Sequence, residues 1–208
     1  MIELTAGQTR AAPARAPEPL ARVQDFLNSV HVERGTDELA DPAAATRFLA
    51  GEMGPDTRRR LDDGWVISKS DVDRLLGVRA ALRALIRVGT GETERAEAAR
   101  TLSETAQSVP VALRVDPDGR LQVVPAGTDC DWFIGQLMTS IQQAQGAGTW
   151  ERLKICRADA CAWVFYDTSR NHSATWCAMG VCGNRQKVTR HRERRRQSRS
   201  DEPLTGQD

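Results

Sequence analysis

Four of the chain's five cysteines form two closely spaced pairs in its C-terminal quarter. Cys156 and Cys161 are separated by four residues, and Cys177 and Cys182 repeat that spacing after an insert of fifteen residues. In structural zinc sites each pair of thiolates comes from one tight turn, and the insert brings the two turns together. The spacing therefore predicts one tetrahedral Zn²⁺ ion per chain, bound by these four thiolates.

Two disulfides are the alternative use of the same four cysteines. Residues 1–19 are rich in Ala, Pro and Arg and lack the apolar segment of a secretory signal peptide. No apolar run approaches the roughly 18 residues that a membrane span requires. We therefore expect a disordered leader over residues 1–19 and a soluble, cytoplasmic protein with no membrane partner. A reducing compartment favours thiolates on zinc over disulfides.

The net charge of +1 hides an uneven distribution along the chain. Residues 151–199 carry twelve Lys and Arg against four Asp and Glu, a net charge of +8. Residues 1–150 carry 17 basic and 21 acidic residues, a net charge of −4. A basic end on an acidic body indicates that this end binds a polyanion.

The basic end continues a helix that is expected to open at Cys177 and to contain Cys182. Up to Val188 this segment has apolar residues, but residues 189–199 have none, so packing cannot hold a helix there. Such a helix either frays as a solvated tail or is held by phosphates. Its candidates for nucleic-acid contact are Arg185, Lys187, Arg190, Arg192, Arg194, Arg195 and Arg196.

The cysteines need short elements to position them. Residues 153–155 and 162–167 have the composition of two short strands, joined through the first cysteine pair, and residues 168–171 form a turn. A knuckle, a hairpin and a helix that carries the second pair make a treble-clef-like arrangement. Because it has few apolar residues, the metal must stabilise this fold.

The preceding residues read as a mainly helical domain. Apolar residues recur at helical spacing over 20–30 and 72–86, with N-terminal capping expected at Asp41-Pro42 and at Ser70 with Asp73. Residues 111–115 and 121–124 alternate around the turn 116–119, which predicts a β-hairpin. The fold class is therefore α+β: a helical domain with a hairpin at 20–148, a zinc finger with a basic helix at 150–196, and a disordered tail at 197–208.

Nothing before the finger predicts an enzyme. The sequence contains no phosphate-binding glycine loop, no paired histidines at metal spacing and no nucleophile elbow. Treble clefs also occur in nucleases, which need a catalytic histidine pair or a second metal. Only His172 and His191 lie near the cysteines, so we expect no catalytic activity.

Two stretches resemble a known bacterial family. Cys182-Gly183-Asn184-Arg185, with residues 167–171 upstream, resembles the CGNR zinc finger, and residues 20–30 resemble the opening of the ABATE domain that precedes this finger. The resemblance implies a stress-responsive transcription regulator whose finger binds DNA and whose first domain regulates it. It adds Arg170 and Asn184 to the candidate nucleic-acid contacts.

These observations predict a regulator that contacts double-stranded DNA through its finger and basic helix. The first domain is expected to sense a small-molecule effector, with Asp25 and Asn28 lining the pocket, or to form a homodimer. Asp25 and Asn28 could instead only cap or brace their helix. The alternative for the finger is a module that binds RNA or docks a protein partner without operator specificity.

Overall fold

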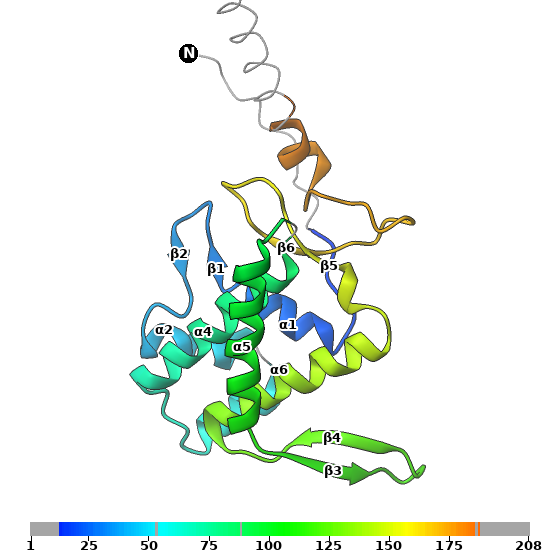
Figure 1. Ribbon diagram of the computed structural model, residues 1–208. Coiled ribbons are helices and arrows are strands. Elements are labelled where there is room, and N and C mark those ends of the chain that lie inside the picture. Colours follow the sequence, from blue (N-terminus) through cyan, green and yellow to red (C-terminus); the bar gives the residue numbers. More distant parts are fainter. Residues whose placement is uncertain (1–12, 53, 88, 186, 188–208) are drawn as a thin grey trace, which may run out of the picture.

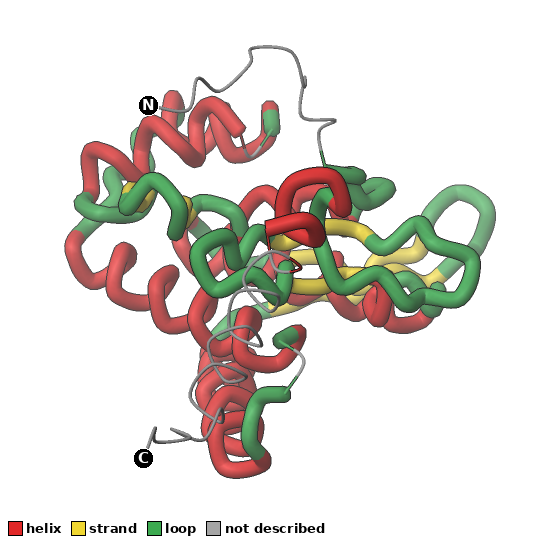
Figure 2. Tube along the Cα trace, turned by 90° about the horizontal axis from the view of Figure 1, so that it is seen from above, coloured by secondary structure: helices red, strands yellow, loops and turns green. Residues whose placement is uncertain are grey.

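The computed structural model describes residues 13–52, 54–87, 89–185 and 187 of the 208-residue chain. Helices dominate these residues, and the strands form three small antiparallel sheets of two strands each (Figure 1, Figure 2). The α-helices are α1 (Leu20–Leu27), α2 (Pro42–Glu52), α3 (Pro55–Asp62), α4 (Lys69–Ile86), α5 (Glu92–Ser108) and α6 (Asp129–Gly146). The strands are β1 (Val30–His31), β2 (Thr36–Asp37), β3 (Val111–Val115), β4 (Leu121–Pro125), β5 (Leu153–Ile155) and β6 (Val164–Tyr166). This arrangement confirms the expected α+β class.

Local signals explain where two helices begin. Asp41 accepts a hydrogen bond from the amide of Ala44 at 2.8 Å, which caps α2 as predicted. Helix α4 begins with a reciprocal capping box between Ser68 and Asp71. The prediction that Ser70 and Asp73 cap this helix was wrong, because the helix begins two residues earlier and Ser68 is its N-cap.

Helices α1, α4 and α6 enclose the core. Phe26 of α1 meets Phe133 of α6 edge to face, with ring centroids 5.8 Å apart. Leu75 and Leu82 of α4 and Leu137 of α6 are buried in the same cluster. The short helix α1 packs against the two long helices α4 and α6, and most of its side chains are buried.

Strands β5 and β6 complete this core rather than forming one of their own. Leu153, Ile155, Ala162 and Val164 are buried together with the apolar residues of the helices. Among the described residues, the four cysteines of the finger and a few neighbours form a second, small cluster. The boundary expected between units 20–148 and 150–196 thus runs through shared packing.

Three polar side chains from the helices bind the backbone at β6. Asn28 donates to the carbonyl of Val164 at 2.8 Å and accepts from its amide at 2.8 Å. Gln24 donates to the same carbonyl at 3.2 Å. Arg83 of α4 donates to the carbonyls of Leu27 and Ala162, each at 2.7 Å. These bonds fix the finger against α1 and α4.

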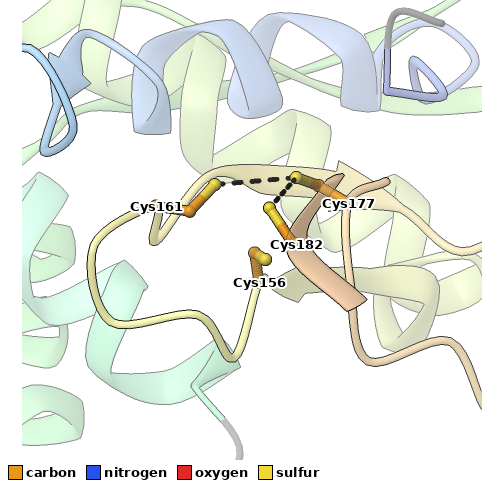
Figure 3. A group of neighbouring side chains, drawn as sticks. All are labelled: Cys156, Cys161, Cys177 and Cys182. Carbon is orange, nitrogen blue, oxygen red and sulfur yellow. Dashed lines mark hydrogen bonds between the residues drawn. The ribbon is translucent and has the colours of Figure 1, made fainter. Parts of the chain in front are cut away.

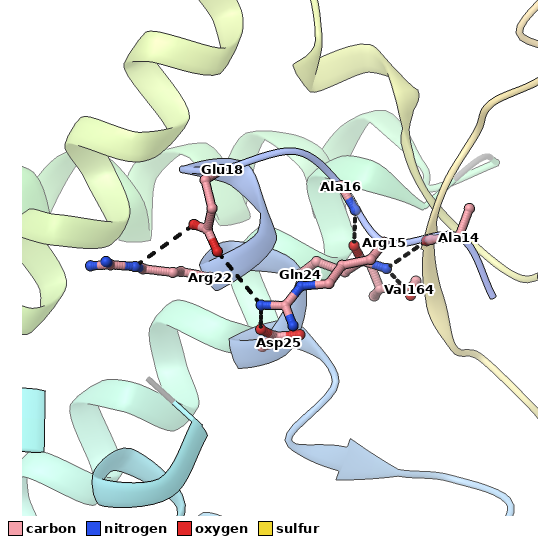
Figure 4. A network of polar contacts seen from close by, with 8 residues as sticks. All are labelled: Ala14, Arg15, Ala16, Glu18, Arg22, Gln24, Asp25 and Val164. Carbon is pink, nitrogen blue, oxygen red and sulfur yellow. Dashed lines mark hydrogen bonds and ion pairs between the residues drawn. The ribbon is translucent and has the colours of Figure 1, made fainter. Parts of the chain in front are cut away.

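Residues 13–19 are attached to the body. The carbonyl of Ala14 accepts a hydrogen bond from the amide of Tyr166 at 3.1 Å, beside β6. Gln24 accepts from the amide of Ala16 at 2.7 Å, and Arg15 pairs with Asp25 at 2.6 Å (Figure 4). The expected disordered leader is therefore wrong for residues 13–19, because the edge of β6 and the amide of Gln24 bind this backbone. Residues 1–12 and the expected tail at 197–208 lie outside the described residues.

The β3–β4 hairpin is confirmed. Val111 pairs with Pro125, Leu113 with Val123 and Val115 with Leu121. The hairpin projects from the helices at the end of the molecule opposite the finger (Figure 1). Among the described helices, none has the length and apolar character needed to cross a membrane.

Candidate metal centre and nucleic-acid surface

The four cysteines that the sequence singled out converge on one point (Figure 3). The sulfur of Cys177 lies 3.6 Å from that of Cys161 and 3.7 Å from that of Cys182, and all four sulfurs lie within 4.8 Å of one another. A tetrahedron of thiolates at the usual Zn–S distance has edges of about 3.8 Å. A disulfide needs sulfurs about 2.05 Å apart, and all four cysteines are free. The geometry therefore fits one zinc ion and rules out the disulfide alternative.

Two backbone turns present the ligands. Cys156 follows β5, and the amide of Cys161 closes a tight turn onto the carbonyl of Ala158 at 2.8 Å. On the other side, the helical turn Met179–Gly183 holds Cys182, whose amide donates to the carbonyl of Ala178 at 2.9 Å. Cys177 lies just before this turn, so the predicted helix opens two residues later than expected. The treble-clef description of these elements stays a prediction.

The electrostatics of the cluster call for a cation. All four cysteines are buried. Hydrogen bonds from Cys161 and Cys177 lower the pKa of Cys156, because they favour its thiolate. The hydrogen bond to Cys156 in turn raises the pKa of Cys177, and burial raises the pKa of Cys182. Four buried thiols cannot all ionise alone, and a divalent cation among the sulfurs supplies the missing charge.

Gly183, the second residue of the CGNR word, lies where a side chain would be crowded. A Cβ atom there would be 2.4 Å from the sulfur of Met179 and 3.2 Å from Cδ1 of Trp176. Met179 is exposed and can move aside, but Trp176 packs on the cysteine cluster. Glycine thus lets the metal-binding turn lie directly against this indole ring.

Asp167 organises the loop between the two cysteine pairs. Its carboxylate accepts hydrogen bonds from Lys154 at 2.6 Å, from the amide of Ser169 at 2.8 Å and from the amide of Ala174 at 3.0 Å. Burial would raise the pKa of this carboxyl, but the hydrogen bonds from Lys154 and Ser169 outweigh burial and hold the pKa well below its usual range. No role for Asp167 was predicted from the sequence. The available signal was its place at the end of the predicted strand 162–167, with Lys154 in the neighbouring predicted strand 153–155.

Four predicted nucleic-acid contacts fall within the described residues. Arg170, Asn184, Arg185 and Lys187 are all exposed. The guanidinium of Arg185 pairs with Glu33 in the loop between β1 and β2, at 3.2 Å. The other predicted contacts lie outside the described residues, and they are Arg190, Arg192, Arg194, Arg195 and Arg196. The nucleic-acid role of all nine residues stays a prediction.

Asp25 and Asn28 lie on the wall of a cavity of about 390 Å³ between the helices and the finger. Its other walls include Arg47, His31 and Trp163. The rings of His31 and Trp163 lie 5.2 Å apart, and both also line a neighbouring cavity of about 230 Å³ next to Cys161. The sequence gave no signal that these two rings meet, because 132 positions separate them. Asn28 bonds Val164 with both atoms of its amide, so it braces the finger whether or not an effector binds.

Comparison with known families gives matches in both the finger and the preceding helical region. The CGNR zinc finger matches residues 152–195. The ABATE family, described as "Putative stress-induced transcription regulator", matches residues 20–133, which is more than half of the chain. No curated protein matches the chain. With its zinc-binding cysteines in place and more than half of its length matched, the chain belongs to the ABATE family and carries the CGNR zinc finger of residues 152–195.

Proposed function

We propose that this protein is a transcription regulator whose finger binds duplex DNA. The observation that carries the proposal is the position of the exposed residues after the metal. Cys182 is a zinc ligand, and Asn184, Arg185 and Lys187 follow it on helical residues that point to solvent. Zinc thus fixes the start of a basic segment. The whole region that contains it, residues 151–199, has a net charge of +8. Such a segment suits the phosphates and base edges of a DNA groove.

Packing favours duplex DNA over single-stranded RNA. Sequence-specific RNA binding relies on aromatic rings that are free to stack on bases. Phe165 is buried in the cysteine cluster, and Trp163 packs at a tilt against His31. The alternative is a finger that docks a protein partner, for which duplex DNA is not the specific ligand.

Binding of duplex DNA across about 50 to 300 mM salt tests the proposal. If roughly four to six cationic side chains meet phosphates, log K falls with log[salt] at a slope of about −4 to −5. Neutralising Arg194, Arg195 and Arg196 together is expected to weaken all sequences alike and to flatten the slope by up to about three units. A flat slope for the intact protein would rule out duplex recognition by this segment.

Arg185 is the side chain best placed for a defined contact, because it lies nearest to the zinc ligands. Arg185→Ala is expected to cost about 1–3 kcal/mol of specific binding, and less of non-specific binding, if this arginine reads a base. Arg100→Ala, on the exposed face of α5, removes the same charge far from the finger and serves as the control. Equal losses on specific and random DNA would reduce Arg185 to one more phosphate contact.

We further propose that residues 20–148 either sense an effector or form a homodimer. The cavity that contains Asp25 supports the sensing role, because its wall also includes Trp163 of the finger. A small molecule there would contact both parts of the chain. A ligand that binds only the folded state raises the melting temperature by mass action.

A thermal-shift screen of metabolites, repeated on Arg47→Ala, tests the sensing role. Arg47 is exposed on the wall of the cavity, whereas Arg58→Ala on α3 removes an exposed arginine elsewhere. We expect a ligand whose shift is lost in the first variant and kept in the second, and which changes the affinity for DNA. No shift across a broad screen would leave dimer formation as the role of this region.

A further inference from the structure

The β3–β4 hairpin has two chemically different faces. Residues two apart in a strand share a face, and so do residues paired directly across an antiparallel ladder. The pairing therefore places six side chains on one face, here called the apolar face. They are Val111, Leu113, Val115, Leu121, Val123 and Pro125. The opposite face carries Ala112, Arg114, Gln122 and Val124.

Most of the apolar face of the hairpin is exposed rather than packed against the helices. Five hairpin residues line a groove of about 920 Å³ whose other walls include Gln136 and Thr139 of α6. They are Arg114, Gln122 and Val124 of the opposite face and, at the base of the hairpin, Val123 and Pro125 of the apolar face. The other four residues of the apolar face are left largely in solvent. Their exposed fractions are 53 % for Val111, 69 % for Leu113, 63 % for Val115 and 65 % for Leu121. A hairpin that covers its own domain normally turns its apolar face inward.

The base of the hairpin fixes this orientation. A Cβ atom on Gly135 of α6 would lie 3.0 Å from Cβ of Pro125 and 3.2 Å from Cγ1 of Val109. A Cβ atom on Gly127 would lie 2.9 Å from Cβ of Asp131. Both glycines let the hairpin approach α6 closely, so its projecting part is held at its base (Figure 1). A shift of one residue in the pairing would exchange the faces, and this close packing opposes it.

We infer that the apolar face is a dimer interface, occupied by the apolar face of a second copy of this chain. The face carries no charged side chain, so it suits a partner surface that is also uncharged and apolar. A twofold axis brings a surface against its own copy, so every apolar side chain of one hairpin meets an apolar side chain of the other. Two-stranded sheets are marginal alone, and stacking face to face at about 10 Å gives each hairpin the second layer it lacks.

The size of the face sets the strength expected of this dimer. Four largely exposed residues per copy is well below the roughly 20–30 residues a side of a standard stable interface. The dimer should therefore be weak, reversible and dependent on concentration. Since the hairpin and the finger lie at opposite ends of the molecule, the two fingers would lie on the outside of the dimer (Figure 1).

Sedimentation equilibrium of the zinc-loaded full-length protein, from about 5 to about 300 µM, tests the inference. The native protein is expected to shift from monomer to dimer over this range. Leu113→Lys places a charge at the centre of the apolar face and should weaken the dimer at least tenfold. Ala112→Lys places the same charge on the opposite face of the same strand and should leave the dimer unchanged. Far-UV circular dichroism of each variant checks that the fold is intact.

Three outcomes would overturn the inference. A native protein that stays monomeric throughout would leave the face to a different partner. A Leu113→Lys protein that dimerises as well as the native one would place the interface elsewhere. Equal loss of the dimer in both variants would contradict the assignment of the faces.

The proposed dimer interface rests on the homodimer considered under the proposed function. Sedimentation does not measure DNA binding, so the two proposals are tested separately. A dimer that fails to bind DNA would therefore refute only the proposed DNA-binding function.

Discussion

At the scale of single residues, buried polar groups hold the finger in place. Asp167 accepts three hydrogen bonds and pairs with Lys154, whose side chain is itself mostly buried. Lys154 also donates to the carbonyl of His172. One carboxylate therefore links a strand, a turn and the approach to Cys177.

Asp167→Asn is expected to lower the free energy of unfolding by about 3–5 kcal/mol, because it leaves the ammonium of Lys154 buried without its counter-charge. Chemical denaturation of the zinc-loaded protein measures this change. Asp159→Asn removes an exposed carboxylate from the same finger and should change the stability much less. If the two variants have similar free energies of unfolding, the pair of Asp167 with Lys154 adds no more stability than an exposed carboxylate does.

A second, partly buried pair joins Asp37 of β2 to Arg79 of α4. Arg79 also donates to the hydroxyl of Ser29 at 2.8 Å. Burial of Asp37 would raise its pKa, but the hydrogen bond from Arg79 outweighs burial, and the net pKa is lowered. A carboxyl whose folded pKa is below its unfolded value of about 3.9 stabilises the fold above that value, and the contribution is lost as the pH falls through the folded pKa.

The free-energy difference between the native protein and Asp37→Asn should therefore be constant from about pH 8 to pH 5 and shrink below about pH 4. Its plateau is expected at about 1–3 kcal/mol, since Arg79 keeps Ser29 as a partner. Comparing both proteins at each pH cancels the effect of zinc release. Asp73→Asn, in an exposed pair with Lys69, is the control and should show no such plateau. A difference that grows toward low pH would contradict the sign.

At the scale of elements, strands β5 and β6 connect the metal to the helices. Val164 is fully buried against α1, and its backbone bonds Asn28. The expected division into units 20–148 and 150–196 implies that loss of a zinc ligand unfolds only the finger. The shared core changes that expectation, because an unfolded finger would also uncover the apolar side of α1.

Removing zinc with a chelator, or replacing Cys182 by Ser, is expected to destabilise α1 as well as the finger. Hydrogen exchange of the backbone amides measures this for each element. Exchange should accelerate at least tenfold in α1, while β3 and β4, which lie far from the finger, change little. Unchanged protection of α1 would restore the view of two independent units.

The elements that depend on local pattern could be predicted from the sequence, and those that depend on partners could not. Three features were predicted from short local patterns. They are the metal centre from the cysteine spacing, the first hairpin strand from the alternation at Val111–Val115, and the cap of α2 from Asp41-Pro42. The polarity of Gln24 and Asn28 gave no indication of their partner, which lies 136 or more positions away. Periodicity shows which side of α1 is buried, but not that β6 is what covers it.

At the scale of the whole molecule, Arg185 and Glu33 join the finger to the loop between β1 and β2. Both side chains are about half exposed, so the pair is a weak one. It nevertheless occupies the arginine that we propose contacts DNA. Binding to DNA would have to separate Arg185 from this carboxylate.

Glu33→Gln is therefore expected to raise the affinity for duplex DNA by about two- to fivefold, with a smaller gain at high salt. Glu38→Gln, at the residue that follows β2, makes the same change in net charge without removing Glu33 from Arg185, and it should raise the affinity less. Fluorescence anisotropy at two salt concentrations compares the three proteins. Equal gains in both variants would mean that only the net charge matters.

The bonds between α1 and β6 also bear on how the protein folds as it is made. Asn28 leaves the ribosome 136 residues before its partner Val164. At roughly 5–20 residues per second, α1 waits about 7 to 27 seconds for the strand that covers it. Ala14, which bonds Tyr166, waits longer still. Helix α1 is therefore covered only after β6 has been made, and the finger that contains β6 is expected to need zinc to keep its fold.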